Sequence, residues 1–249
     1  ISAYVYAVND YFAKHKTLNK RNLLLYKANL IEQFKPKTVN LRIQALNKFL
    51  EHVGKPRLRL KSVKVQQRTY LENVISQADY IFLKKRLKQE ENLMWYFVVR
   101  FLTATGARVS ELIQIKVEHV RIGYFDIYSK GGKVRRLFIP KLLRDEAKKW
   151  FEEIQQTTGY IFRNRFGERI TTRGIAQQLK KYAERYGLNT NVVYPHSFRH
   201  RYAKNFLERF NDIALLADLM GHESIETTRI YLRRTSSEQQ AIVDKVITW

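Results

Sequence analysis

The chain has 249 residues, of which 45% are hydrophobic, 13% aromatic and 28% charged, a balance that excludes a disordered polyelectrolyte and indicates buried cores. Lysine and arginine number 46 against 23 acidic residues, for a formal net charge of +23, so the surface favours a polyanion, with nucleic acid the leading candidate. No apolar run approaches the length of about 18 residues that a membrane span needs. The absence of cysteine excludes disulfides and cysteine-ligated zinc and fits a reducing compartment. We therefore expect a cytoplasmic protein, nucleoid-associated when bound if its polyanion is DNA.

The first region of the chain has the pattern of a small helical bundle. Residues 2–15, 22–34 and 38–53 each show helical spacing of apolar residues. In the third segment the spacing alternates between four and three residues, at Val39, Ile43, Leu46, Leu50 and Val53. We expect Thr38 to cap this helix and Gly54 to end it.

Positive charge is densest in this first region. Residues 1–68 hold 15 basic residues against 3 acidic ones, whereas residues 69–249 hold 31 against 20. Residues 54–70 contain six basic residues and no acidic one, and their apolar residues follow no helical or strand spacing. This pattern is typical of a linker. Such a segment is either a path along a duplex or simply a solvated basic surface.

The second region is predicted to be mostly helical, with one β-hairpin. Residues 76–90 and 92–106 have helical patterns, and the second is apolar nearly all round, which predicts a buried helix. Residues 124–140 contain two β-rich runs flanking Gly131-Gly132, a hairpin signal. Further helices are predicted at residues 141–154, 172–187, 197–210, 212–222, 224–232 and 237–247. The expected fold class is therefore mainly α with a small antiparallel β-sheet.

Four separated stretches place polar residues next to predicted element boundaries: TGARVSEL (105–112), SKGGKVRR (129–136), PHSFRHRY (195–202) and MGHESIETTRIYL (220–232). Arg108 follows a Thr-Gly break, where its guanidinium is either paired with Glu111 or directed at an anion. Lys130 is predicted at the hairpin tip, where a solvated lysine is the simpler interpretation. His196 and Arg199 are three residues apart at a helix start and so share one face, although a structural histidine would fit the same pattern.

In this order, the stretches resemble the tyrosine recombinases, also called lambda-type integrases. The matching residues are Arg108, Lys130, His196, Arg199, His222 and Tyr231. The similarity covers residues from about 70 to 249, and the basic helical region before them is similar to the core-binding domain of the family. It implies a two-domain C-shaped clamp on DNA, with a helical core DNA-binding domain at 1–60, a basic linker at 61–72, and a catalytic domain with a C-terminal tail helix at 73–249.

The resemblance implies that the hydroxyl of Tyr231 attacks a phosphodiester and becomes bonded to the 3′ phosphate. Arg108 and Arg199 would hold the phosphate oxygens with planar, permanently charged forks. His222 would donate a further hydrogen bond, and His196 would accept the phenol proton as general base.

In the family the lysine that matches Lys130 acts as the acid that protonates the departing 5′ oxygen. Such chemistry needs no ATP, metal ion or other cofactor. A metal nuclease is the rival for a basic protein that cuts DNA, but the close acid pair of Glu223 and Glu226 is more typical of a solvated helix start. Glu111 is expected to orient Arg108 or His196, and a surface carboxylate is the alternative.

Contacts to DNA are expected from basic and amide side chains of the first domain, the linker and the helix at 172–187, where a solvated face explains the pattern nearly as well. The candidates are Arg42, Lys55, Arg57, Arg59, Lys61, Lys64, Arg173, Gln177, Gln178 and Lys180.

Residues 237–249 carry a short apolar stripe at Ile242, Val243, Val246 and Ile247. This segment resembles the tail with which family members contact a neighbouring protomer, although packing in cis would use the same stripe. The resemblance thus implies a homotetramer on paired double-stranded DNA sites, with a dimer on each site. The function expected is site-specific recombination. A type IB topoisomerase and a DNA-binding regulator with an idle active site are the alternatives.

Overall fold

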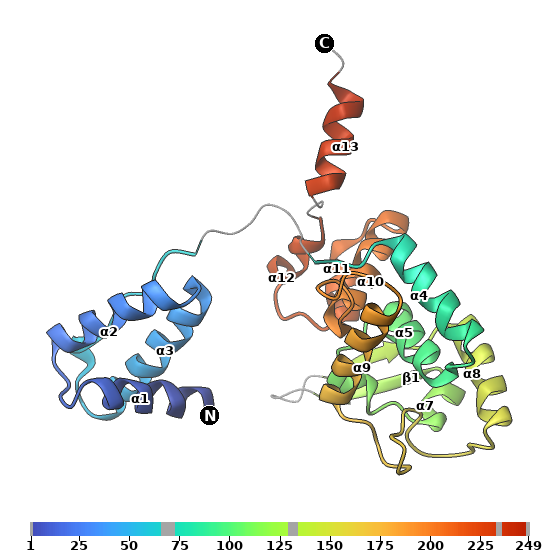
Figure 1. Ribbon diagram of the computed structural model, residues 1–249, viewed down its shortest axis with the longest axis horizontal. Helices are drawn as coiled ribbons and strands as arrows, with labels where there is room; N and C mark the ends of the chain where they lie inside the picture. The colour runs from blue at the N-terminus through green and yellow to red at the C-terminus, as the bar shows by residue number, and fades with distance from the viewer. Residues whose placement is uncertain (1, 66–72, 129–133, 233–235, 248–249) are drawn as a thin grey trace. The chain divides into compact units, whose positions relative to one another are not determined.

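The computed structural model describes residues 2–65, 73–128, 134–232 and 236–247. The chain divides into two compact units, Ile1–Arg68 and Thr69–Trp249 (Figure 1). Each unit has a hydrophobic core of its own. No helix within the described ranges is long and apolar enough to cross a membrane.

The first unit is a bundle of three helices followed by a short 3-10 turn. These elements are α1 (Ser2–Lys14), α2 (Lys20–Gln33), α3 (Pro36–His52) and η1 (Pro56–Leu58). The expectation that Thr38 caps the third helix is wrong, because α3 begins at Pro36, whose fixed φ suits the first helical position. Gly54 follows the helix end with a left-handed φ of 70°, as expected. The bundle buries Tyr11, Leu23, Tyr26, Leu30, Val39, Ile43, Leu46, Leu50 and Leu60.

The chain after η1 is held on α3 by two asparagines. The side chain of Asn47 exchanges two hydrogen bonds of 2.9 Å with the backbone of Leu60. Asn40 does the same with Val63, at 2.8 and 2.9 Å. Because the two asparagines are seven residues apart, they lie on one face of the helix. The first residues of the predicted linker at 61–72 therefore pack on the bundle, and residues 66–72 lie outside the described part of the chain.

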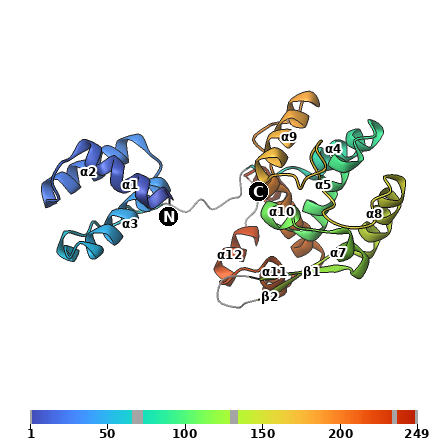
Figure 2. The same cartoon turned by 90° about the horizontal axis from the view of Figure 1, so that it is seen from below.

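The second unit is built around α5, a helix that is apolar on nearly every side. Its elements are α4 (Gln77–Gln89), α5 (Leu93–Thr105), α6 (Val109–Leu112), α7 (Val117–Ile122), β1 (Tyr124–Tyr128), β2 (Val134–Phe138), α8 (Lys141–Glu153), α9 (Thr172–Arg185), α10 (Pro195–Arg209), α11 (Ile213–Met220), α12 (Ile225–Arg229), η2 (Ile230–Leu232) and α13 (Ser236–Val246). α5 packs against α4, α8 and α10 (Figures 1 and 2). Burial of its whole circumference confirms the prediction for residues 92–106.

The two strands form one antiparallel sheet, in which β1 packs against α7 and β2 packs against α11 (Figure 2). Tyr124 pairs with Phe138 and Tyr128 with Val134. Along β2 burial alternates, so that Arg135 and Leu137 face inward. Gly131-Gly132 lies outside the described residues. Helices around a two-stranded sheet confirm the fold class that the sequence predicts.

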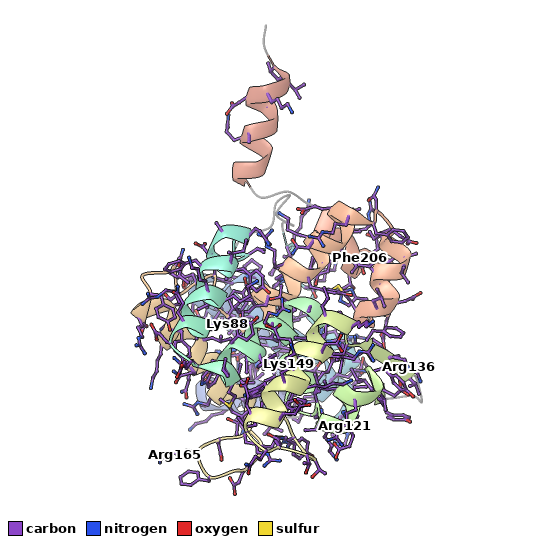
Figure 3. All side chains as sticks on the ribbon, turned by 90° about the vertical axis from the view of Figure 1, so that its right-hand side faces the viewer. Lys88, Arg121, Arg136, Lys149, Arg165 and Phe206 are labelled. Atoms are coloured by element: carbon purple, nitrogen blue, oxygen red, sulfur yellow. The ribbon has the colours of Figure 1, made fainter. Side chains whose placement is uncertain are left out.

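Arg121, Arg136 and Lys149 are exposed on the second unit (Figure 3). The last helix, α13, also leaves apolar side chains exposed, with Val243 at 50% and Val246 at 57%. A helix in this segment is what the sequence predicts.

Candidate active site

Two residues of the predicted set, His196 and Arg199, lie in the first turns of α10. The helix begins at Pro195, whose fixed φ favours a helix start. His196 is exposed, whereas Arg199 is only 1% exposed. Partial desolvation and then the charges of Arg199 and Arg108 lower the pKa of His196. The ring is therefore neutral at pH 7 and able to accept a proton.

The guanidinium of Arg199 is held by the ends of two helices. Its Nη1 donates to the carbonyl of Gly106 at 2.5 Å, and its Nη2 donates to that of Met220 at 2.6 Å. These carbonyls end α5 and α11, where the helix leaves them without intrahelical partners and the dipole is negative. Burial and then the charge of Arg108 lower the pKa of Arg199 to about 10, so it remains a cation at neutral pH.

Arg108 is both paired within the protein and open to a ligand. Its Nη1 lies 2.9 Å from Oε1 of Glu111, and its Nη2 donates to the carbonyl of Gly221 at 3.2 Å. The Arg108 side chain is still 42% exposed. Arg108 can therefore pair with Glu111 and bind an anion at the same time, because a guanidinium has donors on two edges.

Glu111 is buried at 5% exposure, so the alternative of a surface carboxylate is wrong. Burial alone would raise the pKa of Glu111, but bonds and charges from Arg135 and Arg108 lower it below its ordinary value. The carboxylate also accepts from the backbone N–H of Arg108 at 2.7 Å. Glu111 therefore fixes both the backbone and the side chain of Arg108.

His222 follows α11, whose end at Gly221 has a left-handed φ of 61°. Its Nδ1 lies 2.8 Å from Oγ1 of Thr228, and its Nε2 lies 3.2 Å from Nη2 of Arg199. Because arginine has only donors, Nε2 must accept and Nδ1 must carry the proton. Burial and then the charges of Arg199 and Arg108 lower the pKa of His222 to about 4, so the ring is neutral at pH 7.

Tyr231 lies in η2 and is 4% exposed. Its ring stacks on that of His222, with centroids 6.1 Å apart, and contacts that of His200 at 5.2 Å. Burial raises the pKa of the phenol, while the charges of Arg199 and Arg108 oppose this rise. The predicted nucleophile is therefore held between imidazoles and beside two guanidiniums.

The fold thus brings together five of the six predicted catalytic residues. They come from three stretches that are separated in sequence, and they are Arg108, His196, Arg199, His222 and Tyr231. The sixth, Lys130, lies outside the described residues, between the ends of β1 and β2.

His200 was not predicted as part of the site, although it occurs in the same HSFRH stretch. Its ring lies between those of His196 and Tyr231, at centroid distances of 4.4 and 5.2 Å. Burial and then the charges of its neighbours lower the pKa of His200 to about 4. Its spacing of one helical turn from His196 is the signal that could have placed it here.

Arg135 is the second residue that the sequence did not assign. It is 9% exposed, lies 2.5 Å from Oε2 of Glu111 through its Nη2, and donates through Nη1 to the carbonyl of Leu219 at 2.6 Å. The alternation of β2 could have revealed it, because a residue two places from the buried Leu137 must face the same way.

The predicted DNA contacts differ in exposure. In the first unit Lys55, Arg57, Arg59, Lys61 and Lys64 are exposed, and on α9 so are Arg173, Gln177 and Lys180, with Gln178 half-buried. Arg59 pairs with Glu51 at 2.9 Å. Arg42 departs from this pattern, because its guanidinium is paired with Asp10 at 2.9 Å and lies over the rings of Tyr6 and Phe34. Its guanidinium is therefore engaged within the bundle, and a DNA contact from Arg42 stays a prediction.

Within the described ranges, no three His, Asp or Glu side chains are arranged to hold a metal ion. Glu223 and Glu226 are exposed, and Glu226 pairs with Arg229 at 3.1 Å. This is the solvated position that the sequence indicates for the two acids.

Comparison with known proteins gives a consistent result. The sequence profile of the Phage integrase family matches residues 82–238. The tyrosine recombinase XerA of Pyrococcus furiosus is 27% identical over 98% of this chain and 87% of its own length. The tyrosine recombinase XerC of Lactobacillus delbrueckii subsp. bulgaricus is 33% identical over 54% of this chain and 48% of its own length.

Solved structures share the fold. The XerH site-specific recombinase, bound to a palindromic difH substrate in a post-cleavage complex, has a TM-score of 0.75 at 18% identity, covering 99% of this chain and 78% of that one. A lambda integrase dimer bound to a COC′ core site has a TM-score of 0.71 at 16% identity, covering 92% and 86%. The chain belongs to the phage integrase family of tyrosine recombinases.

Proposed function

We propose that the chain is a site-specific DNA recombinase that breaks and rejoins strands through a covalent bond between Tyr231 and a 3′ phosphate. The observation that carries this proposal is the convergence of Arg108, Arg199 and His222 on the phenol. During attack on a phosphodiester the phosphorus centre gains negative charge, which fixed guanidiniums are suited to stabilise. The membership of the family and its DNA-bound structural relatives support the same reaction class.

The phosphate site is proposed to lie against Arg199 and Arg108. In the described part of the chain, Nε of Arg199 is buried and has no hydrogen-bond partner. Buried donors are normally satisfied, so a nonbridging oxygen of the scissile phosphate would complete this one. The exposed edge of Arg108 would bind a second oxygen. Permanent cations would thus supply the charge stabilisation that a metal ion supplies in other nucleases.

The proton path follows from which imidazoles are accessible. His196 is neutral and exposed, so it is the proposed acceptor of the proton from the Tyr231 hydroxyl. As the bond from the Tyr231 oxygen to phosphorus forms, the bond from phosphorus to the 5′ oxygen breaks. Lys130 is the proposed donor of the proton that this leaving oxygen needs. His222 can donate to the phosphate only if its Nε2 carries the proton, that is, in the tautomer in which Nδ1 accepts from the Thr228 hydroxyl, while Arg199 keeps its bonds to Gly106 and Met220.

Both units are proposed to bind DNA, the first through its basic residues and the second through α9 and the active site. Exposed Lys55, Arg57 and Lys61 support the first contact, and Arg173, Gln177 and Lys180 are spaced to share one face of α9. The assembly proposed is a homotetramer on two sites, in which the exposed apolar residues of α13 contact a neighbouring protomer.

A nicked suicide substrate tests the reaction, because loss of the small 5′ fragment traps a covalent intermediate. We expect a covalent protein–DNA adduct from the unaltered chain, in the presence of EDTA, and none from Tyr231→Phe. Tyr160→Phe is the matched control, since Tyr160 lies at the Lys116 bridge, outside the proposed site.

An adduct from Tyr231→Phe, or an adduct that chelation abolishes, would contradict the proposed chemistry. DNA binding by the unaltered protein without any adduct would indicate a regulator, and supercoil relaxation by monomers without exchange of strands would indicate a topoisomerase. Deleting residues 236–249 is expected to leave cleavage on one site but to remove tetramers, measured as the mass of the DNA complexes. Intact tetramers after this deletion would exclude the proposed tail contact.

A further inference from the structure

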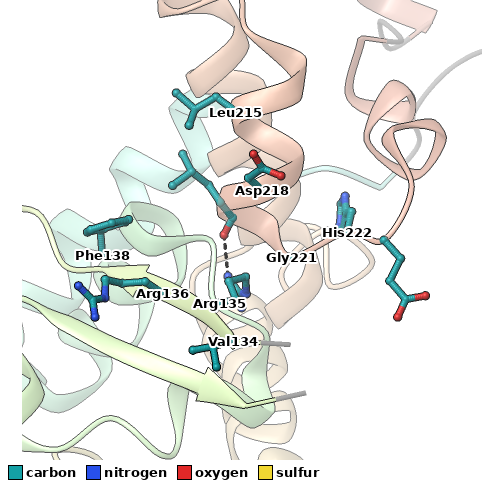
Figure 4. Close-up of a pocket in the computed structure, with 10 residues that line it drawn as sticks. Val134, Arg135, Arg136, Phe138, Leu215, Asp218, Gly221 and His222 are labelled. Atoms are coloured by element: carbon teal, nitrogen blue, oxygen red, sulfur yellow. Dashed lines mark hydrogen bonds between the residues drawn. The ribbon is translucent and has the colours of Figure 1, made fainter. Parts of the chain in front are cut away.

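We propose that Arg135 is a positioning residue for strand cleavage, which holds the turn that carries His222 and, through Glu111, the guanidinium of Arg108. This inference rests on the proposed function, because the residues that Arg135 holds are those of the proposed phosphate site. Arg135 lies on β2, facing the end of α11, and it lines a cavity of about 560 Å³ together with Gly221 and His222 (Figure 4).

The carbonyls at the end of α11 show why this arginine matters. The last carbonyls of any helix lack intrahelical partners and must be satisfied elsewhere. Here the carbonyls of Ala217 and Asp218 accept from the backbone N–H groups of His222 and Gly221. The next three accept from three different arginines, in the order Leu219 from Arg135, Met220 from Arg199 and Gly221 from Arg108.

Two of these arginines face the proposed phosphate, and Arg135 is the third. Its Nη1 is 2.6 Å from the Leu219 carbonyl (Figure 4), while its Nη2 is 2.5 Å from Oε2 of Glu111. The other oxygen of Glu111 lies 2.9 Å from Arg108. The contacts therefore form a closed ring through β2, α6 and the end of α11, and Arg108 lies within that ring.

The backbone turn at Gly221 packs closely against the aliphatic part of the Arg135 side chain. A Cβ added to Gly221 would lie 2.3 Å from Cδ and 2.6 Å from Nε of Arg135, which is far inside contact distance. The left-handed φ of Gly221 imposes a second restriction on any larger residue. Because His222 is the next residue, the position of its ring depends on how Arg135 and Gly221 fit together.

Lysine cannot replace this function fully. A guanidinium is planar with donors on more than one edge, so Nη1 of Arg135 can donate to the Leu219 carbonyl while Nη2 forms a close ion pair, without a hydrogen bond, with Oε2 of Glu111. An ammonium at the same place would keep the charge beside Glu111 but would not be fixed by a planar fork. The charge also acts directly, since Arg135 is one of the cations, after Arg199 and Arg108, that lower the pKa of His222, with His196 adding a smaller effect.

Arg136 provides a matched control on the same strand. Its side chain is exposed (Figure 3), and although it also lines the cavity, it is bonded to β1 and not to the end of α11. It is paired with Asp126 at 2.8 Å and lies over the ring of Tyr124 at 3.8 Å. Arg136→Gln therefore removes one charge from the same strand and the same cavity while leaving the bonds from Arg135 to Leu219 and Glu111 in place.

The experiment compares Arg135→Gln, Arg135→Lys and Arg136→Gln in the full chain on the suicide substrate. Single-turnover cleavage is measured from pH 5 to 9, with the dissociation constant for the same DNA and the melting temperature alongside. We expect Arg135→Gln to cleave about 100-fold more slowly, as small displacements of catalytic groups do, and to bind DNA within about threefold of the unaltered chain. The acidic limb of its pH–rate profile should move to higher pH and into the measured range, because His222 loses a nearby cation, its pKa rises from about 4, and a protonated His222 repels Arg199. Arg135→Lys should be intermediate, and Arg136→Gln should resemble the unaltered chain.

A folded Arg135→Gln with unaltered cleavage and pH profile would overturn the inference. If this variant does not fold, Arg135→Lys decides, since full activity with lysine would show that charge alone suffices and that the fork positions nothing. The result is separable from the proposed function, because absence of an adduct from the unaltered chain refutes the chemistry before any Arg135 variant is compared.

Discussion

The basic residues of the first unit and the arginines around α11 carry the same charge in opposite settings. In the first unit Lys55, Arg57 and Lys61 are exposed, where hydration and salt weaken each interaction. Around α11, Arg199 is 1% and Arg135 is 9% exposed, and each is fixed by helix-end carbonyls or a carboxylate. The first setting suits a long polyanion bound without fixed geometry. The second suits one phosphate bound in a defined position.

The difference shows that the number of exposed charges relates to DNA affinity, whereas the fixed position of buried charges relates to catalysis. The dense charge of the first region predicts affinity for DNA and its dependence on salt. The buried arginines predict catalysis, because preorganised donors stabilise a transition state without reorganising when it forms. Substitutions that keep the charge but change the donor geometry should therefore separate the two regions.

Arg199→Lys should have the largest effect. Lysine retains the positive charge but cannot donate to the carbonyls of Gly106 and Met220 and also bind a phosphate oxygen. We expect single-turnover cleavage to fall by about 10³-fold, as when one donor to a transition-state oxyanion is removed, with little change in DNA affinity. Arg57→Lys, an exposed counterpart in the first unit, should cleave normally. Equal losses from the two variants would show that charge alone is needed at both places.

The sequence predicts much of this arrangement but not the contacts among distant segments. Apolar spacing locates α3 and α5, and the double glycine locates the hairpin, because these signals are local. The chain order of the catalytic residues identifies the family. The role of Arg135, by contrast, depends on α11, whose end lies 84 residues away in sequence. Arg42 turns inward because Asp10, 32 residues earlier, is there to pair with it.

The buried histidines should make the second unit sensitive to acid. The pKa of His200 is about 4 in the folded chain, against about 6.5 when unfolded. Below pH 6.5 the unfolded chain therefore binds a proton that the folded chain does not, so stability falls as the pH drops from 6.5 to 4. The loss from His200 should approach about 3 kcal/mol, and half-buried His222 should add to it.

Tryptophan fluorescence during chemical denaturation measures this loss, because all three tryptophans of the chain belong to the second unit. His200→Gln should reduce the slope of stability against pH between 6.5 and 4. His52→Gln, which removes an exposed histidine from the first unit, is the control and should leave the slope as it is. A slope that is unchanged in His200→Gln would mean that the imidazole is protonated in the folded chain.

The smallest effect is expected where the charges are exposed. Lys55→Gln combined with Arg57→Gln should weaken DNA binding and reduce the slope of log affinity against log salt by about 1.8, or about 0.9 for each lost phosphate contact. Cleavage at saturating protein should not change. Arg42→Gln is the informative comparison, because its guanidinium is bound to Asp10 and to two aromatic rings. It should destabilise the bundle and leave the salt slope unaltered. A reduced salt slope in Arg42→Gln would mean that Arg42 breaks its ion pair with Asp10 and contacts a phosphate when DNA binds. DNA binding by the first unit would then also depend on how its charged side chains are held.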